Sequence, residues 1–244
     1  MRLKCLGCEA LARLIYLSAA QSPHIVDIEL FALGLHNRPN ELRRLLQEAV
    51  DATSAEDYDA IILGYGICGK ATVGLSSPKI PMIIPRAHDC ITLFLGDRTR
   101  YKEQFEDNPG TYWYTIDYIE RRKPGDALGA TSASTDSAAQ YQEYVEKFGK
   151  DNADYLMEVM GAWESHYQRA VFIDMGVGDG TAVATNAEAI AQRRNWLYEK
   201  MTGDLVLIRK LIMGEWDEDF LVLDPGQSID MSFDDNIVEC VLAG

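Results

Sequence analysis

The sequence predicts an α/β protein built on an open, parallel, Rossmann-like sheet, with a helical insertion or with two lobes around a cleft. Through the first 95 residues, short apolar runs alternate with stretches at helical spacing, the pattern of successive strand–helix–strand units. Loops containing glycine or proline follow several of these runs. The chain has 244 residues, 47% of them hydrophobic, which suffices for one large domain or two small ones.

The first half is expected to contain four strands, at residues 2–6, 25–33, 59–64 and 80–84. Helical patterns occupy residues 9–20 and 40–52, and Pro39 suits the first turn of the second helix. Because helices separate these strands, neighbouring strands should run parallel.

The second half has a different character. Residues 100–165 resemble long polar helices and include a linker-like segment at 123–137. Two further strands are expected at 171–174 and 220–223, and two further helices at 187–200 and 205–213. We expect residues 1–122 to carry the functional site, with residues 123–244 packed on them as a second domain or as part of one domain.

Charge divides the chain in the same place. Residues 1–122 hold 14 basic and 16 acidic residues, a net charge of −2, whereas residues 123–244 hold 9 and 22, a net charge of −13. The total of −15 disfavours nucleic-acid binding. Neither a signal peptide nor a run of roughly 20 apolar residues is evident. With an odd cysteine count, these features predict a cytoplasmic protein with free thiols and no membrane segment.

Thiol and imidazole side chains follow the predicted strands of the first half. Since the carboxyl ends of parallel strands meet at one edge of a sheet, these side chains are expected to converge there. Such residues bind zinc, or an iron–sulfur cluster where thiolates dominate. The expected metal ligands are Cys8, Cys68, His88 and Cys90.

The alternative is that the thiols are ordinary small buried side chains. Cys5 lies within a predicted strand, where alternation places it on the opposite face from Cys8, and Cys240 is expected to be incidental. The pair His88-x-Cys90 resembles the zinc ligands of corrinoid-dependent thiol methyltransferases, although here the distant Cys68 precedes the pair instead of following it.

Other residues near these positions complete the predicted site. His36, Arg86 and Asp89 are the candidate catalytic residues, and Arg86 and Asp89 flank His88. Alternatively, His36 only braces the turn before its helix. Gly64, Gly66 and Gly69 either let the backbone approach a cofactor or merely form a tight turn.

A second glycine-rich segment, at residues 171–181, resembles the first motif of S-adenosylmethionine-dependent methyltransferases. It contains Gly176, Gly178 and Gly180, but only 64 residues follow, and the acidic residue expected about 20 positions later, Glu199, lies in a helical pattern. A turn that directs Asp174 toward the cleft, as a cofactor-binding residue, is the preferred interpretation. Aromatic residues at 112–118 either stack on a flat ligand or pack helices onto the sheet.

Several segments together resemble domain of unknown function family 1638. They are LGYGICGKATVGL (63–75), IPRAHDCITLFLG (84–96), NPGTYWYT (108–115) and GDLVLIRKLIMGEWDEDFLVLDPG (203–226). The resemblance covers nearly the whole chain. It implies an anaerobic setting, and cysteines and histidines matching Cys8, His36, Cys68, His88 and Cys90. It also implies association with corrinoid-dependent methyltransferases of one-carbon metabolism, but no known reaction.

Three functions follow as hypotheses. The first is a zinc-thiolate methyltransferase, or its methyl-transfer partner, acting on a small-molecule thiol or other methyl acceptor with a methylated corrinoid protein as donor. The second is an iron–sulfur redox or carrier protein. The third is a non-catalytic accessory that binds a corrinoid protein or methyltransferase.

Overall fold

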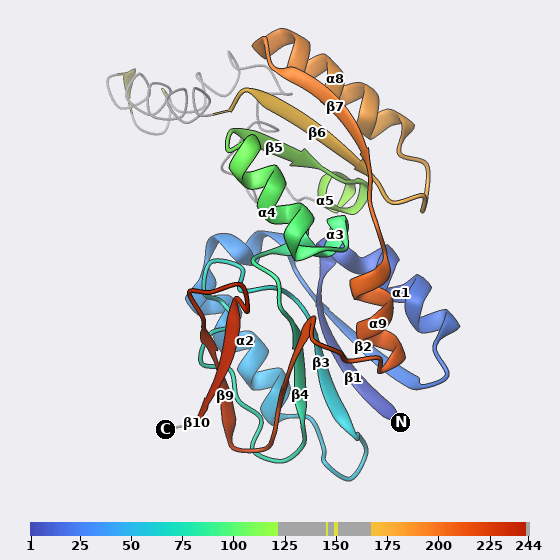
Figure 1. The fold of residues 1–244 in the computed structure, drawn as a ribbon, viewed down its shortest axis with the longest axis vertical. Coiled ribbons are helices and arrows are strands. Elements are labelled where there is room, and N and C mark those ends of the chain that lie inside the picture. Colours follow the sequence, from blue (N-terminus) through green and yellow to red (C-terminus); the bar gives the residue numbers. More distant parts are fainter. Residues whose placement is uncertain (122–144, 146–148, 151–166, 243–244) are drawn as a thin grey trace.

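The computed structural model describes residues 1–121, 145, 149, 150 and 167–242 (Figure 1). Its central sheet has five strands in the order β2-β1-β3-β4-β8. Four of them are mutually parallel, and β8 pairs antiparallel with β4 at the edge. The strands are β1 (Arg2–Cys8), β2 (Ile25–Phe31), β3 (Ala60–Gly64), β4 (Met82–Pro85) and β8 (Phe220–Leu223). The predicted α/β class is confirmed, and the sheet is mostly parallel, with an antiparallel strand at one edge that the sequence did not predict.

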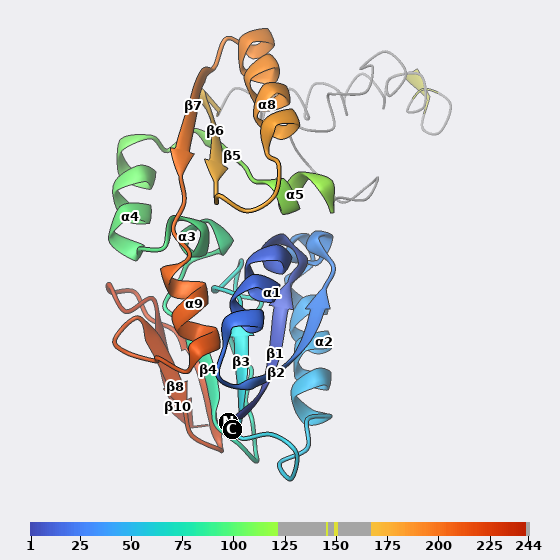
Figure 2. The same cartoon turned by 90° about the vertical axis from the view of Figure 1, so that its right-hand side faces the viewer.

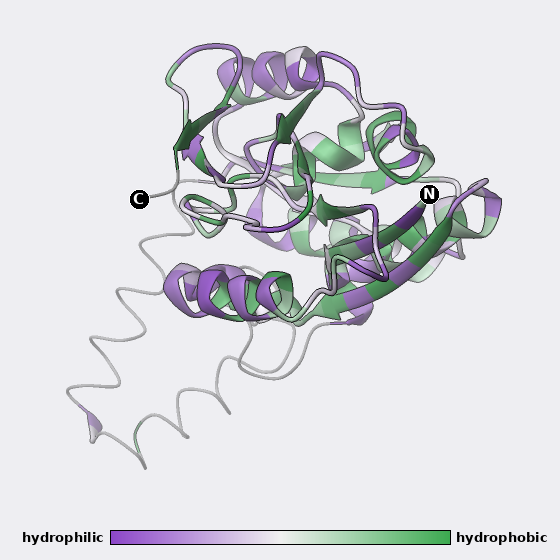
Figure 3. Cartoon of the chain, turned by 90° about the horizontal axis from the view of Figure 1, so that it is seen from below, coloured by the Kyte–Doolittle hydropathy of each residue, from purple (hydrophilic) through white to green (hydrophobic). Residues whose placement is uncertain are grey.

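Helices cover both faces of this sheet. Helices α1 (Ala12–Gln21) and α9 (Val206–Met213) contact each other on one face, and α2 (Pro39–Asp51) lies on the other (Figures 1 and 2). Every residue of β3 and β4 is therefore buried, which explains why these strands are continuous apolar runs in the sequence. Figure 3 shows the hydrophobic strands inside and polar surface along the outer helices.

The strand order contains a topological switch point. From β1 the chain passes through α1 to β2 on one side, and from β2 through α2 to β3 on the other side of β1. The loops that leave the carboxyl ends of β1 and β3 therefore diverge, and a crevice opens between them, which is where ligands bind in open α/β sheets. Cys8 is the last residue of β1, and Gly64 is the last residue of β3.

A second, three-stranded parallel sheet faces this edge, in the order β5-β6-β7. Its strands are β5 (Thr111–Tyr114), β6 (Arg169–Asp174) and β7 (Leu197–Thr202), and α8 (Thr181–Arg194) packs on them with a hydrophobic cluster of its own. Between the two sheets lie α3 (Cys90–Leu95), α4 (Arg98–Asp107) and α5 (Ile116–Glu120) (Figure 2).

Several predicted elements need correction. The helix expected over 187–200 ends at Arg194, because Asn195 adopts a left-handed conformation (φ 55°), and β7 follows. Strand β5 and the antiparallel hairpin of β9 (Gln227–Met231) and β10 (Val238–Leu242) were not predicted.

The segment 123–137 and most of the expected helical insertion lie outside the described residues. Within the described ranges, no helix has the length and apolar character needed to cross a bilayer.

Candidate functional site

A pocket of about 410 Å³ lies at the carboxyl edge of the five-stranded sheet, beneath β5 and α5. Its lining includes three thiols from different parts of the chain, at the end of β1 (Cys8), on the loop after β3 (Cys68) and at the start of α3 (Cys90), together with His36 and Asp89. No lysine or arginine occurs among the described residues that line it. The structure therefore brings together five residues that the sequence placed after four different strands.

Cys8 reaches the pocket as the last residue of β1, with 8% of its surface exposed. Beside it lies the buried side chain of Tyr65, the first residue after β3. The Tyr65 hydroxyl has no nitrogen or oxygen partner in the part of the chain that the structure describes. Since a buried hydroxyl normally has a partner, this group is available to the Cys8 sulfur or to a ligand.

Cys68 lies on a loop held in an unusual conformation. Cys68, Gly69 and Lys70 all have positive φ, at 47°, 66° and 71°. Two of these are not glycine, and residues held in that region at some cost in energy are found preferentially at functional sites. Backbone N–H groups of Gly66 and Cys90 face the Cys68 sulfur and would stabilise its thiolate form.

The loop after β3 is pressed against the loop after β4. Two hydrogen bonds join them, from Ile67 N to Ala87 O and from Cys68 N to His88 O, both 2.9 Å. A Cβ atom on Gly66 would lie 2.6 Å from the carbonyl oxygen of Ala87, so only glycine fits there. Gly66 thus sets the spacing between the loops that carry Cys68 and Cys90, whereas Gly64 and Gly69 line the pocket itself.

Asp89 fixes the start of α3 and so the position of Cys90. One carboxylate oxygen of Asp89 accepts hydrogen bonds from the backbone N–H groups of Ile91 (2.9 Å) and Thr92 (3.4 Å). The other accepts from the Tyr101 hydroxyl at 3.2 Å. Cys90 follows as the first helical residue, which turns its side chain toward the pocket.

Burial keeps the thiols in their neutral form. It raises the pKa of Cys8 to about 11, against smaller lowering by the Ala10 N–H and the Tyr65 hydroxyl. Burial also raises the pKa of Cys68 and of Cys90, with further contributions from the neighbouring thiols and from Asp89. The pKa of Asp89 is itself raised by burial. The protein provides no cationic side chain in this lining that would favour thiolates.

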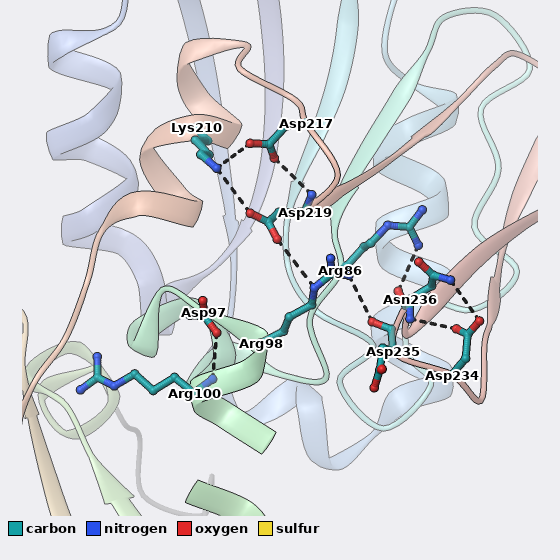
Figure 4. Close-up of polar contacts among 10 residues, drawn as sticks. All are labelled: Arg86, Asp97, Arg98, Arg100, Lys210, Asp217, Asp219, Asp234, Asp235 and Asn236. Carbon is teal, nitrogen blue, oxygen red and sulfur yellow. Dashed lines mark hydrogen bonds and ion pairs between the residues drawn. The ribbon is translucent and has the colours of Figure 1, made fainter. Parts of the chain in front are cut away.

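Three predicted site residues lie elsewhere. His88 is exposed, outside the pocket lining, and its ring stacks on Tyr101 with centroids 5.4 Å apart. Arg86 points to the C-terminal hairpin, where its guanidinium donates to the carbonyl oxygen of Asn236 (Figure 4). It also donates to the carbonyl oxygen of Val238. Asp174 pairs with Lys200 at 2.8 Å and accepts from the Gly176 N–H.

The aromatic contribution to the pocket was not assigned from sequence. Tyr112 and Tyr114 belong to the α8-side cluster, whereas Trp113 packs against the main core, as alternation along β5 requires. Trp113 of β5 and Tyr118 of α5 line the pocket on the side of the second sheet, and Tyr65 and Phe94 line it on the side of the five-stranded sheet. The aromatic run at residues 112–118 was the available signal.

The described residues contain no group of three His, Cys, Asp or Glu side chains already arranged around a common point as metal ligands. Cys8, Cys68 and Cys90 share the pocket, but their sulfur atoms would have to turn toward one another to bind one ion. The arrangement as it stands is a thiol-lined, aromatic pocket with one carboxylate.

A family model described as "Protein of unknown function (DUF1638)" matches residues 30–212. The match spans most of the chain, so the protein belongs to this family, as the sequence motifs predicted. Of the pocket residues named above, only Cys8 precedes the matched region. No curated protein and no solved structure matches the chain significantly.

Proposed function

We propose that this DUF1638 protein is a metal-site protein in which the thiols of Cys8, Cys68 and Cys90 hold a zinc ion that serves methyl transfer. One observation carries the proposal: three thiols, at or after the carboxyl ends of three strands, line one pocket at the topological switch point of the sheet. Ordinary buried cysteines would have no reason to meet at the one edge where such sheets bind ligands.

The donor set fits zinc in kind. Cysteine thiolates are among the common zinc ligands, and three protein ligands with a fourth position left open distinguish a catalytic site from a structural one. The raised pKa values of the thiols fit as well, because a cation must supply the positive charge that the lining lacks. A bound zinc ion would hold an external thiol as its thiolate.

The surrounding residues have separate tasks in this proposal. The buried Tyr65 hydroxyl, which has no nitrogen or oxygen partner among the described residues, donates to the Cys8 sulfur and stabilises its thiolate. Asp89 keeps α3, and with it Cys90, in place through its two backbone hydrogen bonds. Trp113 and Phe94 exclude water from the thiols. His36 lines the same pocket and is the base available to accept a proton from an incoming thiol.

The wider setting is part of the same proposal. The two sheets act as lobes of a Rossmann-like scaffold around the pocket, and a methylated corrinoid protein approaches the open side as methyl donor. Five free cysteines fit a reducing, cytoplasmic compartment.

Metal analysis of anaerobically purified protein tests the proposal. We expect about one zinc per chain, and much less in Cys68→Ser and Cys90→Ser, because each removes one of three ligands. Cys240→Ser is the matched control, since Cys240 is exposed on β10, away from the pocket. Less than about a tenth of an equivalent of any metal would refute the proposal, and so would full metal retention by both pocket variants.

An iron–sulfur cluster is the second candidate, and the position of His88 favours it. With His88 outside the pocket, the predicted ligand set reduces to three cysteines, which can hold a cluster with one iron open to a ligand. A brown preparation with iron and sulfide, in place of zinc, would select this candidate. A colourless, iron-free protein after anaerobic reconstitution would exclude it.

A further inference from the structure

We propose that the pocket binds a methylated ammonium compound, a small organic cation whose nitrogen carries methyl groups in place of hydrogens. The inference names the ligand class of the pocket and in that sense rests on the proposed function. It is carried, however, by features other than the thiols: aromatic side chains on two sides of the pocket, one carboxylate, and the absence of lysine and arginine from the described lining.

Aromatic side chains line the pocket from two opposite sides. Tyr65 and Phe94 come from the five-stranded sheet and α3, and Trp113 and Tyr118 come from β5 and α5. Tryptophan and tyrosine rings attract cations through their negative faces, and enclosure by several rings is how proteins recognise quaternary ammonium groups. The alternation along β5, which directs Trp113 away from the α8 cluster, places the strongest such ring here.

The charge of the lining has the matching sign. Asp89 is the acidic residue of the described lining, and neither lysine nor arginine is present to oppose a cation. A cation in the pocket would offset the unfavourable burial of the Asp89 charge, which hydrogen bonds already stabilise in part. In the metal-free pocket, an anionic ligand would meet Asp89 and the thiols with no lysine or arginine to offset its charge.

Methylation is inferred from the aromatic walls of the pocket and from the commitment of its one carboxylate to other donors. An ammonium with several N–H groups needs an acceptor for each, whereas both Asp89 oxygens already accept hydrogen bonds. A methylated ammonium needs none and presents apolar methyl groups to the rings. The volume of about 410 Å³ lies within the range of small-molecule sites and leaves room for a substituent beside the cationic head.

Binding of two isosteric probes by the purified protein tests the inference, measured by titration calorimetry with metal content determined on the same sample. Choline carries a trimethylammonium group, and 3,3-dimethylbutan-1-ol has the same shape without the charge. We expect choline to bind at least about tenfold more tightly, as one or two cation–aromatic contacts provide. Equal affinities, or no binding of choline, would overturn the inference.

Two variant pairs place the binding in this pocket. Trp113→Leu should weaken choline about tenfold, whereas Trp216→Leu, another partly buried tryptophan packed on the main core but outside the pocket, should not. Asp89→Asn keeps the helix cap and removes the charge, so it should weaken choline and leave the neutral alcohol unaffected. Asp97→Asn alters the equivalent cap of α4 and is its control. Unchanged choline binding in both pocket variants would overturn the assignment.

The two proposals fail separately in this design. Choline binding by protein without metal would support the ligand class and refute the metal site. Metal-loaded protein that does not bind choline would support the metal site and refute the ligand class.

Discussion

Replacing Gly66 with alanine tests whether the contact between two loops sets the spacing of the thiols. The new Cβ would lie 2.6 Å from the Ala87 oxygen, 2.7 Å from the Asp89 nitrogen and 2.9 Å from the His88 carbonyl carbon. All three are backbone atoms, so no flexible side chain can move aside. Relief requires the loops to separate by about 0.8 Å, the shortfall from the 3.4 Å at which ordinary contact begins.

That displacement would stretch the two loop–loop hydrogen bonds, at Ile67 and Cys68, from 2.9 Å to about 3.7 Å, which is beyond hydrogen-bonding range. Their loss costs about 1–3 kcal/mol in total, and residual overpacking adds a similar amount. We therefore expect Gly66→Ala to lower the free energy of unfolding by about 2–6 kcal/mol and to weaken metal and choline binding together.

Urea denaturation followed by circular dichroism measures this loss. Gly226→Ala is the control, because Gly226 has a φ of 87° and open space where a Cβ would be. It carries only the left-handed backbone cost of about 1–2 kcal/mol and lies away from the pocket. If Gly66→Ala were no more destabilising than Gly226→Ala, or left both ligands bound normally, the loop-spacing argument would be wrong.

Three further predictions concern stability. The buried carboxylate of Asp117 accepts hydrogen bonds from the backbone N–H and guanidinium of Arg13 and from the guanidinium of Arg121. Asp117→Asn should therefore lower the free energy of unfolding, measured by urea denaturation, by about 1–3 kcal/mol. Glu120→Gln, which breaks an exposed ion pair with Arg13, should lower it by less than about 1 kcal/mol. Because folding raises the pKa of Cys8 from 9.0 to about 11, its stabilising contribution is present below pH 9 and is lost as the pH rises through that window, so Cys8→Ala should flatten the decline of stability with pH. Asp89→Ala should lower the melting temperature through loss of the α3 cap, about 1 kcal/mol, while Asp89→Asn should leave it nearly unchanged.

The parallel strands were predictable because burial on both faces leaves a continuous apolar run, as in residues 59–64 and 80–84. The end of α8 was not, since residues 195–200 remain compatible with helical spacing and only the left-handed Asn195 redirects the chain. The antiparallel direction of β8 was likewise invisible, because a four-residue apolar run carries no information about its partner.

The cysteines of the site were predictable from strand ends, but the side-chain directions around His88 were not. Two residues of separation place side chains on one face only if the backbone stays regular. Here the backbone changes from loop to helix at Asp89, whose carboxylate caps α3. Cys90 consequently turns inward to the pocket, and His88 turns outward onto Tyr101. A cap residue inside a short motif is a reason to doubt that the motif acts as one ligand pair.

Charge balance connects the metal with the organic cation. The described lining holds one carboxylate and three thiols, all in surroundings that oppose ionisation, and neither lysine nor arginine. Burial therefore disfavours the thiolate forms, and a ligand that brings positive charge into the pocket would favour them. A cation bound at the aromatic side should accordingly lower the pKa of the thiols. Choline should then accelerate alkylation of pocket cysteines at pH 8 unless it blocks access, whereas 3,3-dimethylbutan-1-ol, which fills the same space, can only slow it. Slowing of equal extent by both probes would show that occupancy, and not charge, governs these thiols.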